Sequence, residues 1–494
     1  MNGKKLFESN YFTNISGNLD IECSSLVFDS RQVEKGCVYV AIKGAVFDGH
    51  SFVLDAVKAG ASVVVISDAV EGLEGASREI TVVKVEDTKY ALALLSAAWF
   101  GYPAKELKTI GITGTKGKTT TTYLVKSILE NAGLRVGLIG TIETIIGEKH
   151  IPSKNTTPDS YRIHQYFREM VDAGLDAVVM EVSSQALKYH RTAGIIFDYG
   201  IFTNLSPDHI GPNEHDDFED YLSSKGKLFI QCKVGIVNGD DAHVERVLKG
   251  HTCKIDSYGF GEGCALTASN LQLIKVPGEL GVAFDVKGDL ALHVEFPMPG
   301  NFSVHNALCA IAICKNFGVK TEDIQKALKG AKVKGRIEMV PVSDKFTLLI
   351  DYAHNAMALE SLLTTLKEYD TGRLVSVFGC GGNRSRDRRF EMGEVSGRLA
   401  DLTIITSDNP RNEEPLDIIA DIVTGMKKTD GQYIEIPDRK EAIRYAIVNG
   451  QPGDLIVLAG KGHEDYQEIK GVKYPMDERN LIREVLTEEG LLVE

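Results

Sequence analysis

Short apolar runs alternate with longer amphipathic stretches along the chain. In the first hundred residues, runs rich in β-branched side chains predict buried strands at 25–28, 37–42, 62–66 and 81–85. A helical pattern follows at 89–100 and ends at Gly101-Tyr-Pro103. The N-terminal region is therefore predicted to mix strands and helices.

The same alternation continues towards the C-terminus. A strand that begins at Lys108 leads through a glycine-rich loop into a helix, and a later helix at 321–329 ends at Gly330. Further strands are predicted at 176–182, 199–203, 346–350, 374–378, 402–406 and 455–459. Strands and helices that alternate at this spacing predict parallel sheets covered by helices, which is an α/β fold.

The length of the chain sets the number of domains. Its 494 residues suffice for about three domains of roughly 100–200 residues each. The pattern breaks after the helix that ends near residue 100 and again after Gly330. We therefore predict domains at 1–105, 106–332 and 333–494.

Composition and charge narrow the function classes. The chain is 43% hydrophobic and 25% charged, which is typical of globular proteins, and its net charge is −14. Such a charge argues against extensive binding to nucleic acid or to anionic membranes, but a single basic pocket for a phosphorylated substrate is compatible with it. Because no long apolar run follows the N-terminal lysines or occurs elsewhere, we expect neither a signal peptide nor a membrane-spanning helix. The eight cysteines form no C-x-x-C pair. We expect a cytoplasmic protein with free thiols rather than disulfides or a zinc site.

The glycine-rich loop carries the first candidate chemistry. Gly111-Ile-Thr-Gly-Thr-Lys-Gly-Lys-Thr-Thr120 is one residue longer than the usual phosphate-loop pattern. Its glycines would let backbone N–H groups converge on phosphate oxygens, Lys118 would reach the β- and γ-phosphates, and Thr119 would offer its hydroxyl to Mg²⁺. The absence of Asn-Lys-x-Asp disfavours a GTPase. Glu181, at the end of a predicted strand, is a second possible metal ligand.

Several motifs occur together in an order that is specific. They are Gly114-Thr-Lys-Gly-Lys-Thr-Thr120, Asn155-Thr-Thr-Pro158, Met180-Glu-Val-Ser-Ser184, His190-Arg191, Thr203-Asn-Leu-Ser-Pro-Asp-His209, Asn301-Phe-x-x-x-Asn306, Gly335-Arg-x-Glu338 and Asp351-Tyr-Ala-His354. In this order and over essentially the whole chain, the sequence resembles the Mur ligases, the ATP-dependent amide-bond-forming enzymes of peptidoglycan synthesis. It is most similar to the members that add the third peptide residue.

The resemblance implies a domain organisation and an ATP site. It implies an N-terminal domain for the uridine nucleotide sugar, a central phosphate-loop ATPase-type domain and a C-terminal Rossmann-like domain for the amino acid. Independently of the resemblance, our default expectation is a monomer. The ATP-binding residues it implies are Gly114, Thr115, Lys116, Gly117, Lys118, Thr119, Thr120, Asn301, Asn306, Arg336 and Asp351. Asp351 could instead cap a helix, and His354 could serve only to shape its loop.

The resemblance also implies the chemistry: ATP phosphorylates a carboxylate and an amine then attacks the acyl phosphate. The implied catalytic residues are Lys118, Glu181, His209 and Lys225, and the implied Mg²⁺ ligands are Thr119, Glu181, His209 and a carbamylated Lys225. Carbamylation requires a neutral amine and hence a depressed lysine pKa. Lys227 is the rival lysine, and we expect it to be a solvated charge.

Two further sites follow from the resemblance. The nucleotide-sugar-peptide site would use Ser30, Asn155, Thr156, Thr157, Ser183, Tyr189 and Arg191, although Tyr189, Lys116 and residues 210–215 depart from the usual family pattern. The amino-acid site would use Arg384, Asp408, Asn409, Pro410, Arg411, Gly460 and Glu464. The Asp408-Asn-Pro-Arg411 motif is typical of members that add meso-diaminopimelate to UDP-MurNAc-L-Ala-D-Glu, because a guanidinium can clamp the second carboxylate of that substrate.

Alternatives stay open at this point. The same scaffold could add L-lysine or lanthionine, or act as a folylpolyglutamate synthase-like ligase. A regulatory nucleotide switch is disfavoured by the pair His209 and Lys225. The stretch Gly379-Cys-Gly381 imitates a dinucleotide fingerprint, but Arg384 stands where the third glycine would be. The nearby Arg386, Arg388 and Arg389 are expected to be a solvated charge run.

Overall fold

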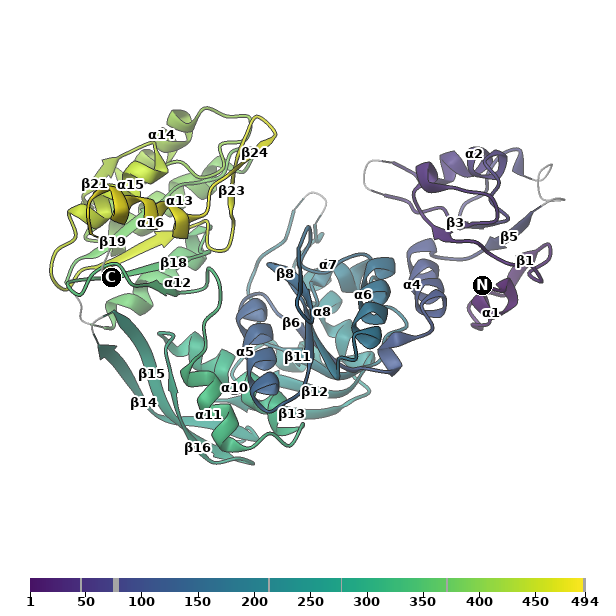
Figure 1. Cartoon of the computed structure of the whole chain (residues 1–494), viewed down its shortest axis with the longest axis horizontal. Helices are drawn as coiled ribbons and strands as arrows, with labels where there is room; N and C mark the ends of the chain where they lie inside the picture. The colour runs from purple at the N-terminus through teal and green to yellow at the C-terminus, as the bar shows by residue number, and fades with distance from the viewer. Residues whose placement is uncertain (45–46, 74–79, 212–213, 277, 370–371, 492–494) are drawn as a thin grey trace. The chain divides into compact units, whose positions relative to one another are not determined.

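The computed structural model describes the chain except residues 45–46, 74–79, 212–213, 277, 370–371 and 492–494. The chain divides into two compact units, which we describe separately (Figure 1). The first comprises residues 1–267 and 308–323, and the second comprises residues 268–307 and 324–494. Both are mixed α/β structures with mainly parallel sheets, so the predicted fold class is confirmed. The three-domain boundaries stay a prediction.

A five-stranded sheet forms the N-terminal part of the first unit, in the order β1-β5-β4-β3-β2. Its strands are β1 (Asn14–Ser16), β2 (Leu26–Val27), β3 (Val38–Val40), β4 (Val63–Ile66) and β5 (Thr81–Lys84), with β1 antiparallel to β5 and the others parallel. Helix α4 (Thr88–Trp99) begins where Asp87 accepts hydrogen bonds from the Lys89 and Tyr90 N–H groups. The predicted strands and helix of this region are therefore present.

In the first unit, the first two residues of β14, Leu266 and Thr267, pair with β13, and the central sheet continues in the order β13-β12-β11-β6-β10-β7-β8-β9. Its strands are β6 (Lys108–Thr113), β7 (Val136–Ile139), β8 (Glu143–Ile146), β9 (Lys149–Pro152), β10 (Ala177–Glu181), β11 (Phe197–Phe202), β12 (Cys232–Asn238), β13 (Lys254–Gly259) and β14 (Leu266–Val276). Pairing is parallel from β14 to β7 and antiparallel for β8 and β9. The main helices are α5 (Lys118–Asn131), α6 (Ser160–Asp172), α7 (Ser184–Lys188), α8 (Phe218–Gly226) and α9 (Val244–Val247).

Strand β6 has β10 on one side and β11 on the other, and its residues from Thr109 to Thr113 are buried. Its apolar side chains need no alternation, because a parallel strand covered on both faces is buried throughout. Since parallel strands end at the same sheet edge, the ends of β6, β10 and β11 bring together residues far apart in the sequence. This edge carries the glycine-rich loop and Glu181.

The second unit contains a six-stranded sheet in the order β17-β18-β22-β19-β20-β21. Its strands are β17 (Glu338–Val340), β18 (Thr347–Asp351), β19 (Leu374–Phe378), β20 (Leu402–Ile405), β21 (Tyr433–Glu435) and β22 (Leu455–Ala459), and β17 alone among these described strands pairs antiparallel. The helices are α12 (Ala356–Lys367), α13 (Arg386–Leu399), α14 (Pro415–Met426), α15 (Arg439–Val448) and α16 (Glu478–Glu488). The second unit also contains the pair β15 (Glu279–Gly288) and β16 (Leu292–Phe296) and the hairpin β23 (Tyr466–Ile469) and β24 (Val472–Pro475). Helices α10 (Asn301–Lys315) and α11 (Thr321–Lys329) each have residues in both units.

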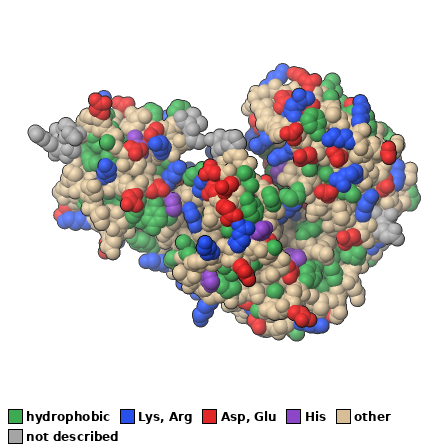
Figure 2. Space-filling view, turned by 180° about the vertical axis from the view of Figure 1, so that it is seen from behind, with side chains coloured by type: hydrophobic (Ala, Val, Ile, Leu, Met, Phe, Trp, Pro, Cys, Tyr) green, Lys and Arg blue, Asp and Glu red, His purple; other side chains and the backbone are tan. Residues whose placement is uncertain are grey.

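The charged side chains on the surface and the state of the cysteines agree with what the composition predicts. Acidic and basic side chains are interspersed on the face drawn in Figure 2, so the net charge of −14 is not gathered into one patch there. All eight cysteines are free, and most are buried. Within the part of the chain that the structure describes, no helix has the length and hydrophobicity needed to span a membrane.

Candidate functional site

The glycine-rich loop connects the buried strand β6 to the first turn of α5. Gly114 and Gly117 have φ values of +153° and +84°, which favour glycine. A Cβ atom on Gly114 would lie 1.9 Å from the Thr203 hydroxyl, so the loop packs too closely on the end of β11 for any side chain. Lys118 donates hydrogen bonds to the carbonyl oxygens of Gly114 (2.8 Å) and Thr115 (3.1 Å). The loop thus has the close-packed backbone and the cation that a phosphate group requires.

The predicted metal ligands Thr119 and Glu181 are in direct contact. The Thr119 hydroxyl donates to the Glu181 carboxylate at 3.0 Å, and both residues are buried. Thr141 also donates to this carboxylate, through its N–H (2.8 Å) and its hydroxyl (3.0 Å). Sequence reasoning missed Thr141, which follows β7 and belongs to no recognisable motif. A hydroxyl and a carboxylate are hard oxygen donors, and this chemistry fits Mg²⁺.

Lys225 lies in the core of the same site. Its side chain extends from α8, is 1% exposed, and donates a hydrogen bond to the Gly114 carbonyl oxygen at 2.8 Å. The ammonium nitrogen also lies 4.4 Å from the centre of the Tyr221 ring. Burial, together with the positive charge of Lys118, holds the pKa of Lys225 well below its usual value. This is the property that carbamylation requires.

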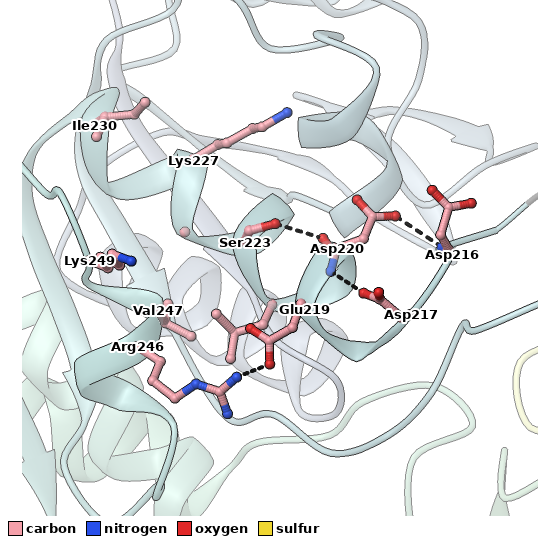
Figure 3. Close-up of a pocket in the computed structure, with 12 residues that line it drawn as sticks. Asp216, Asp217, Glu219, Asp220, Ser223, Lys227, Ile230, Arg246, Val247 and Lys249 are labelled. Atoms are coloured by element: carbon pink, nitrogen blue, oxygen red, sulfur yellow. Dashed lines mark hydrogen bonds and ion pairs between the residues drawn. The ribbon is translucent and has the colours of Figure 1, made fainter.

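Lys227 has a different environment from Lys225. It lines an open surface pocket of about 630 Å³ beside α8 and α9 (Figure 3). Charges in this pocket pair with neighbours: Glu219 with Arg246, and Asp220 with Lys188. The pocket contains none of the predicted site residues. The structure therefore separates the buried lysine from its rival, which is half-buried rather than fully solvated.

His209 is exposed, and its described side-chain contacts are with Glu214 and Tyr221. Its ring nitrogen is 3.3 Å from the Glu214 carboxylate, and its ring centre is 6.1 Å from that of Tyr221. Sequence reasoning missed His215, which is fully buried and hydrogen-bonded to Asp220 (3.0 Å) and to the Ser184 hydroxyl (2.9 Å). Burial lowers the pKa of His215. Nothing in the local sequence distinguishes the buried histidine from the exposed one.

A separate cluster with metal-ligating side chains lies in the N-terminal sheet region. Ligand atoms of Asp48, His50 and Asp68 lie within 4.8 Å of one another. The His50 ring is already fully engaged, because one nitrogen contacts Asp48 (2.7 Å) and the other accepts the Ser67 N–H (3.0 Å). We therefore interpret the cluster as a set of hydrogen bonds that joins two loops, and not as a metal site.

Most of the predicted sugar-peptide residues converge at the end of β10. The Thr157 hydroxyl donates to the Glu181 carbonyl oxygen (2.8 Å) and accepts the Ser183 N–H (3.0 Å), while Arg191 donates to the Thr157 carbonyl oxygen (2.8 Å). Thr156 lies 3.1 Å from the Thr141 hydroxyl. The segment therefore joins the Glu181 region directly.

The other predicted sugar-peptide residues are more peripheral. Asn155 is exposed, and the Tyr189 ring lies under the ammonium group of Lys89 at 4.4 Å. Ser30 begins a short 3₁₀ helix (Ser30–Gln32) that Asp29 caps. The Arg31 side chain and N–H bind the Asp29 carboxylate and lower its pKa to about 2. Within the described part of the chain, Ser30, Asn155 and Tyr189 make no hydrogen bond or ring contact with one another.

The predicted ATP residues of the second unit form two groups. Asn301 is exposed at the start of α10 and Asn306 is buried one turn later. The Arg336 guanidinium lies 4.5 Å above the Tyr352 ring, and Asp351 accepts the N–H groups of Ile337 (2.9 Å) and Ala353 (2.8 Å). Burial raises the pKa of Asp351, and the charge of Arg336 opposes this rise. Burial lowers the pKa of His354, and its ring N–H donates to the Tyr352 carbonyl oxygen at 2.8 Å.

The Asp408–Arg411 loop follows β20 and is held by the hairpin of β23 and β24. Arg411 has a φ of +52° and donates to the Gly382 carbonyl oxygen (2.7 Å) and to Glu468 (3.2 Å). Asn409 donates to Glu464 at 2.9 Å. A Cβ atom on Gly460 would lie 3.0 Å from the Asp408 carboxylate. The structure thus brings Asp408, Asn409, Pro410, Arg411, Gly460 and Glu464 together, whereas Arg384 is exposed.

A buried arginine and several close-packed glycines lie near the Asp408–Arg411 loop. Arg389 is 1% exposed and binds Asp421 (3.0 Å) and Glu413 (2.8 Å), so the prediction of a solvated arginine run was wrong at this position. A Cβ atom on Gly382 would lie 1.9 Å from the Pro410 carbonyl oxygen. The two glycines that imitate a dinucleotide fingerprint pack closely too: a Cβ atom on Gly379 would lie 2.9 Å from the Asp408 nitrogen, and one on Gly381 would lie 2.9 Å from the Arg411 guanidinium. All three glycines therefore permit close packing against the Asp408–Arg411 loop.

Models of known families match three segments of the chain. The Mur ligase family, catalytic domain, matches residues 22–100; the Mur ligase middle domain matches 112–314; and the Mur ligase, glutamate ligase domain, matches 335–462. The glycine-rich loop and the Thr119–Glu181 pair lie in the second of these segments, and the Asp408–Arg411 loop lies in the third.

Relatives match over nearly their full length. A UDP-N-acetylmuramoyl-L-alanyl-D-glutamate–2,6-diaminopimelate ligase from Clostridium tetani is 41% identical, covering 98% of this chain and 99% of its own. A ligase of the same name from Aquifex aeolicus is 43% identical, with 94% of each chain covered. A solved structure of a ligase of this name superposes with a TM-score of 0.73 at 27% identity, covering 99% of both chains.

Proposed function

Because the chain belongs to the Mur ligase family, we propose that it is the ATP-dependent ligase that adds meso-diaminopimelate to UDP-MurNAc-L-Ala-D-Glu. The observation that carries this proposal is the Asp408-Asn-Pro-Arg411 loop, whose Arg411 and Asn409 lie beside Glu464 and Glu468. A cation next to acids suits an amino-acid head that bears both a carboxylate and an ammonium group. Full-length relatives with this named activity support it.

The first half of the reaction activates the carboxylate. The γ-phosphoryl group of ATP moves to an oxygen of the D-glutamyl side-chain carboxylate, the bond to the β-phosphate oxygen breaks, and ADP leaves. Backbone N–H groups around Gly114 and Gly117 and the ammonium group of Lys118 would hold the phosphates and offset their charge. Catalysis of this step rests mainly on positioning and electrostatics.

Mg²⁺ is proposed as the cofactor. When bound, it neutralises charge on the transferred phosphoryl group. Thr119 and Glu181 would hold it, and carbamylated Lys225 and His209 are proposed as ligands of a second ion. The low pKa of Lys225 supports the carbamate, because it favours a neutral amine. The carbamate would convert a buried cation into an oxygen donor.

The second half of the reaction forms the amide. The amine of the amino acid attacks the carbonyl carbon of the acyl phosphate and the C–N bond forms. The bond between that carbon and the phosphate oxygen breaks, inorganic phosphate leaves with its electron pair, and the amine proton passes to solvent. Arg411 would clamp the remote carboxylate and Glu464 the remote ammonium group. Arg384, which is exposed, is proposed as the second arginine that binds carboxylate in this site.

The remaining assignments are also proposals. Ser30, Asn155, Thr156, Thr157, Ser183, Tyr189 and Arg191 would bind the nucleotide sugar and its peptide, and Asn301, Asn306, Arg336 and Asp351 would complete the ATP site. The domain boundaries 1–105, 106–332 and 333–494 would separate these tasks. ATP and nucleotide sugars are cytoplasmic metabolites, so we propose that the protein acts in the cytoplasm. We also propose that it is a monomer.

Phosphate release from ATP tests the proposal. The chain is incubated with UDP-MurNAc-L-Ala-D-Glu and with meso-diaminopimelate, L-lysine or lanthionine in turn. We expect phosphate release that depends on meso-diaminopimelate, with much less for L-lysine. Preferential release with L-lysine or lanthionine would favour the same-scaffold alternative, and no release that depends on an amino acid would reject the proposal. A folylpolyglutamate synthase-like activity is disfavoured because the identity to the relatives extends through residues 22–100.

A further inference from the structure

A buried ammonium group lies at the centre of the Asp408–Arg411 region. Lys461 follows Gly460 at the end of β22, and its side chain is 0% exposed. Its ammonium nitrogen donates to Glu464 (2.8 Å), to Asn409 (3.1 Å) and to the backbone carbonyl oxygen of Tyr466. The Asp408 carboxylate lies 3.7 Å away. Lysine is rarely buried without such partners, so this position is specified by the surrounding acids and amides.

The partners of Lys461 are the groups on which amino-acid binding depends. Asn409 closes a triangle by donating to the same Glu464 oxygen at 2.9 Å. The other side of Asn409 accepts the Glu468 N–H at 2.9 Å, and the Glu468 carboxylate holds the Arg411 guanidinium at 3.2 Å. One ammonium group therefore connects Glu464 to the segment that fixes Arg411.

We propose that Lys461 is a positioning residue: its buried ammonium group holds Glu464 and the Asp408–Arg411 loop in the arrangement that binds the free amino-acid head of the incoming diamino acid. This inference rests on the proposed function and adds a residue to it. Lys461 contacts Glu464 through one carboxylate oxygen, and the second oxygen has the Tyr352 hydroxyl at 3.4 Å. That second oxygen is the one available to a substrate ammonium group.

The charges around Glu464 support this role. Burial would raise the pKa of Glu464, but the charge of Lys461 and the hydrogen bonds from Lys461 and Asn409 lower it. The acid is therefore kept ionised in a half-buried position. Without the ammonium group, Glu464 would face Asp408 with no cation between them, which disfavours the ionised form.

The test is steady-state kinetics of Lys461→Met, which keeps the length of the side chain and removes its charge. We expect the KM for meso-diaminopimelate to rise on the order of a hundredfold, with the KM values for ATP and for the UDP-dipeptide within about twofold of the unchanged chain. Lys461→Arg, which keeps the charge, should recover most of the lost affinity. Lys428→Met is the matched control, because Lys428, just beyond the C-terminal end of α14, is exposed and pairs with Glu394 of α13.

A double-variant cycle separates positioning from general destabilisation. If Lys461 acts through Glu464, Lys461→Met should raise the KM for the diamino acid by less than about threefold in a Glu464→Gln background. Multiplicative effects of the two substitutions, or an equal loss of affinity for all three substrates, would overturn the proposal. If thermal unfolding shows that Lys461→Met does not fold, Lys461→Gln takes its place with the same expectations.

Failure of this inference is distinguishable from failure of the proposed function. If the unchanged chain shows no phosphate release that depends on a diamino acid, the proposed function itself fails. If the unchanged chain is active and Lys461→Met keeps a normal KM for the diamino acid, only the role of Lys461 is rejected. Scrambling of isotope between the bridging and non-bridging oxygens of ATP, measured with the UDP-dipeptide and no amino acid, should persist in Lys461→Met.

Discussion

The ammonium nitrogen of Lys225 lies 2.8 Å from the carbonyl oxygen of Gly114, although 111 positions separate the two residues in the sequence. This contact fastens α8 to the first glycine of the loop between β6 and α5. It also places the lysine with the depressed pKa beside Lys118 rather than in solvent. The predicted phosphoryl-transfer chemistry and the predicted carbamate therefore share one buried region.

Lys225→Ala should abolish ligation and leave the fold intact. The substitution removes the group that would carry the carbamate, so we expect activity to fall by at least about a thousandfold, while circular dichroism and the thermal unfolding midpoint change little. Because a carbamate is a carboxylate, added formate or acetate should restore part of the activity. Lys227→Ala is the control and should stay active; full activity of Lys225→Ala would contradict the assignment.

Glu181→Gln should remove ATP turnover without disturbing substrate recognition. The amide keeps the size of the side chain but lacks the negative charge of the carboxylate, which accepts hydrogen bonds from the Thr119 and Thr141 hydroxyls. We expect kcat to fall on the order of a hundredfold or more, partly offset by raised Mg²⁺. Glu130→Gln, at the exposed end of α5, serves as the control. A kcat close to that of the unchanged chain would exclude Glu181 as a metal ligand.

Arg411→Ala should raise the KM for meso-diaminopimelate more than the KM for L-lysine. L-lysine lacks the second carboxylate, so the loss of the guanidinium should fall mainly on meso-diaminopimelate, with a KM increase of about a hundredfold. Separate kinetics with each amino acid check this, and Arg398→Ala provides an exposed control. Equal effects on both amino acids, or no effect, would refute the clamp.

His164 should make stability depend on pH. This α6 residue is 1% exposed, and both of its ring nitrogens have no hydrogen-bond partner among the described residues. Burial lowers its pKa from 6.5 to about 4. Between these values the unfolded chain takes up a proton that the folded chain does not, so stability is retained above pH 6.5 and decreases as the pH falls.

The size of this effect is about 2 kcal/mol between pH 8 and pH 5. Urea unfolding at both pH values measures it, and His164→Leu should lose this part of the pH dependence. His251→Leu replaces an exposed histidine and should keep it. An unchanged pH dependence in His164→Leu would show that the buried imidazole is not the cause.

The sequence predicted local features well and buried partnerships poorly. The strand, glycine loop and helix around Gly114 were predictable because they are contiguous, and Thr119 and Glu181 could be paired because parallel strands end at one edge. Arg389 was misjudged because composition does not reveal that one face of α13 meets Asp421 of α14. Lys461 was overlooked because a lysine in a polar loop is normally exposed, and only the fold brings Asn409 and Glu464 around it.

A competition experiment tests the central claim most directly. The chain is given ATP, Mg²⁺, UDP-MurNAc-L-Ala-D-Glu and equal amounts of meso-diaminopimelate, L-lysine and lanthionine, and the products are identified by mass. We predict that the meso-diaminopimelate product dominates, with stoichiometric release of ADP and phosphate. A product that contains L-lysine or lanthionine as the main species, or no amide product at all, would contradict the account.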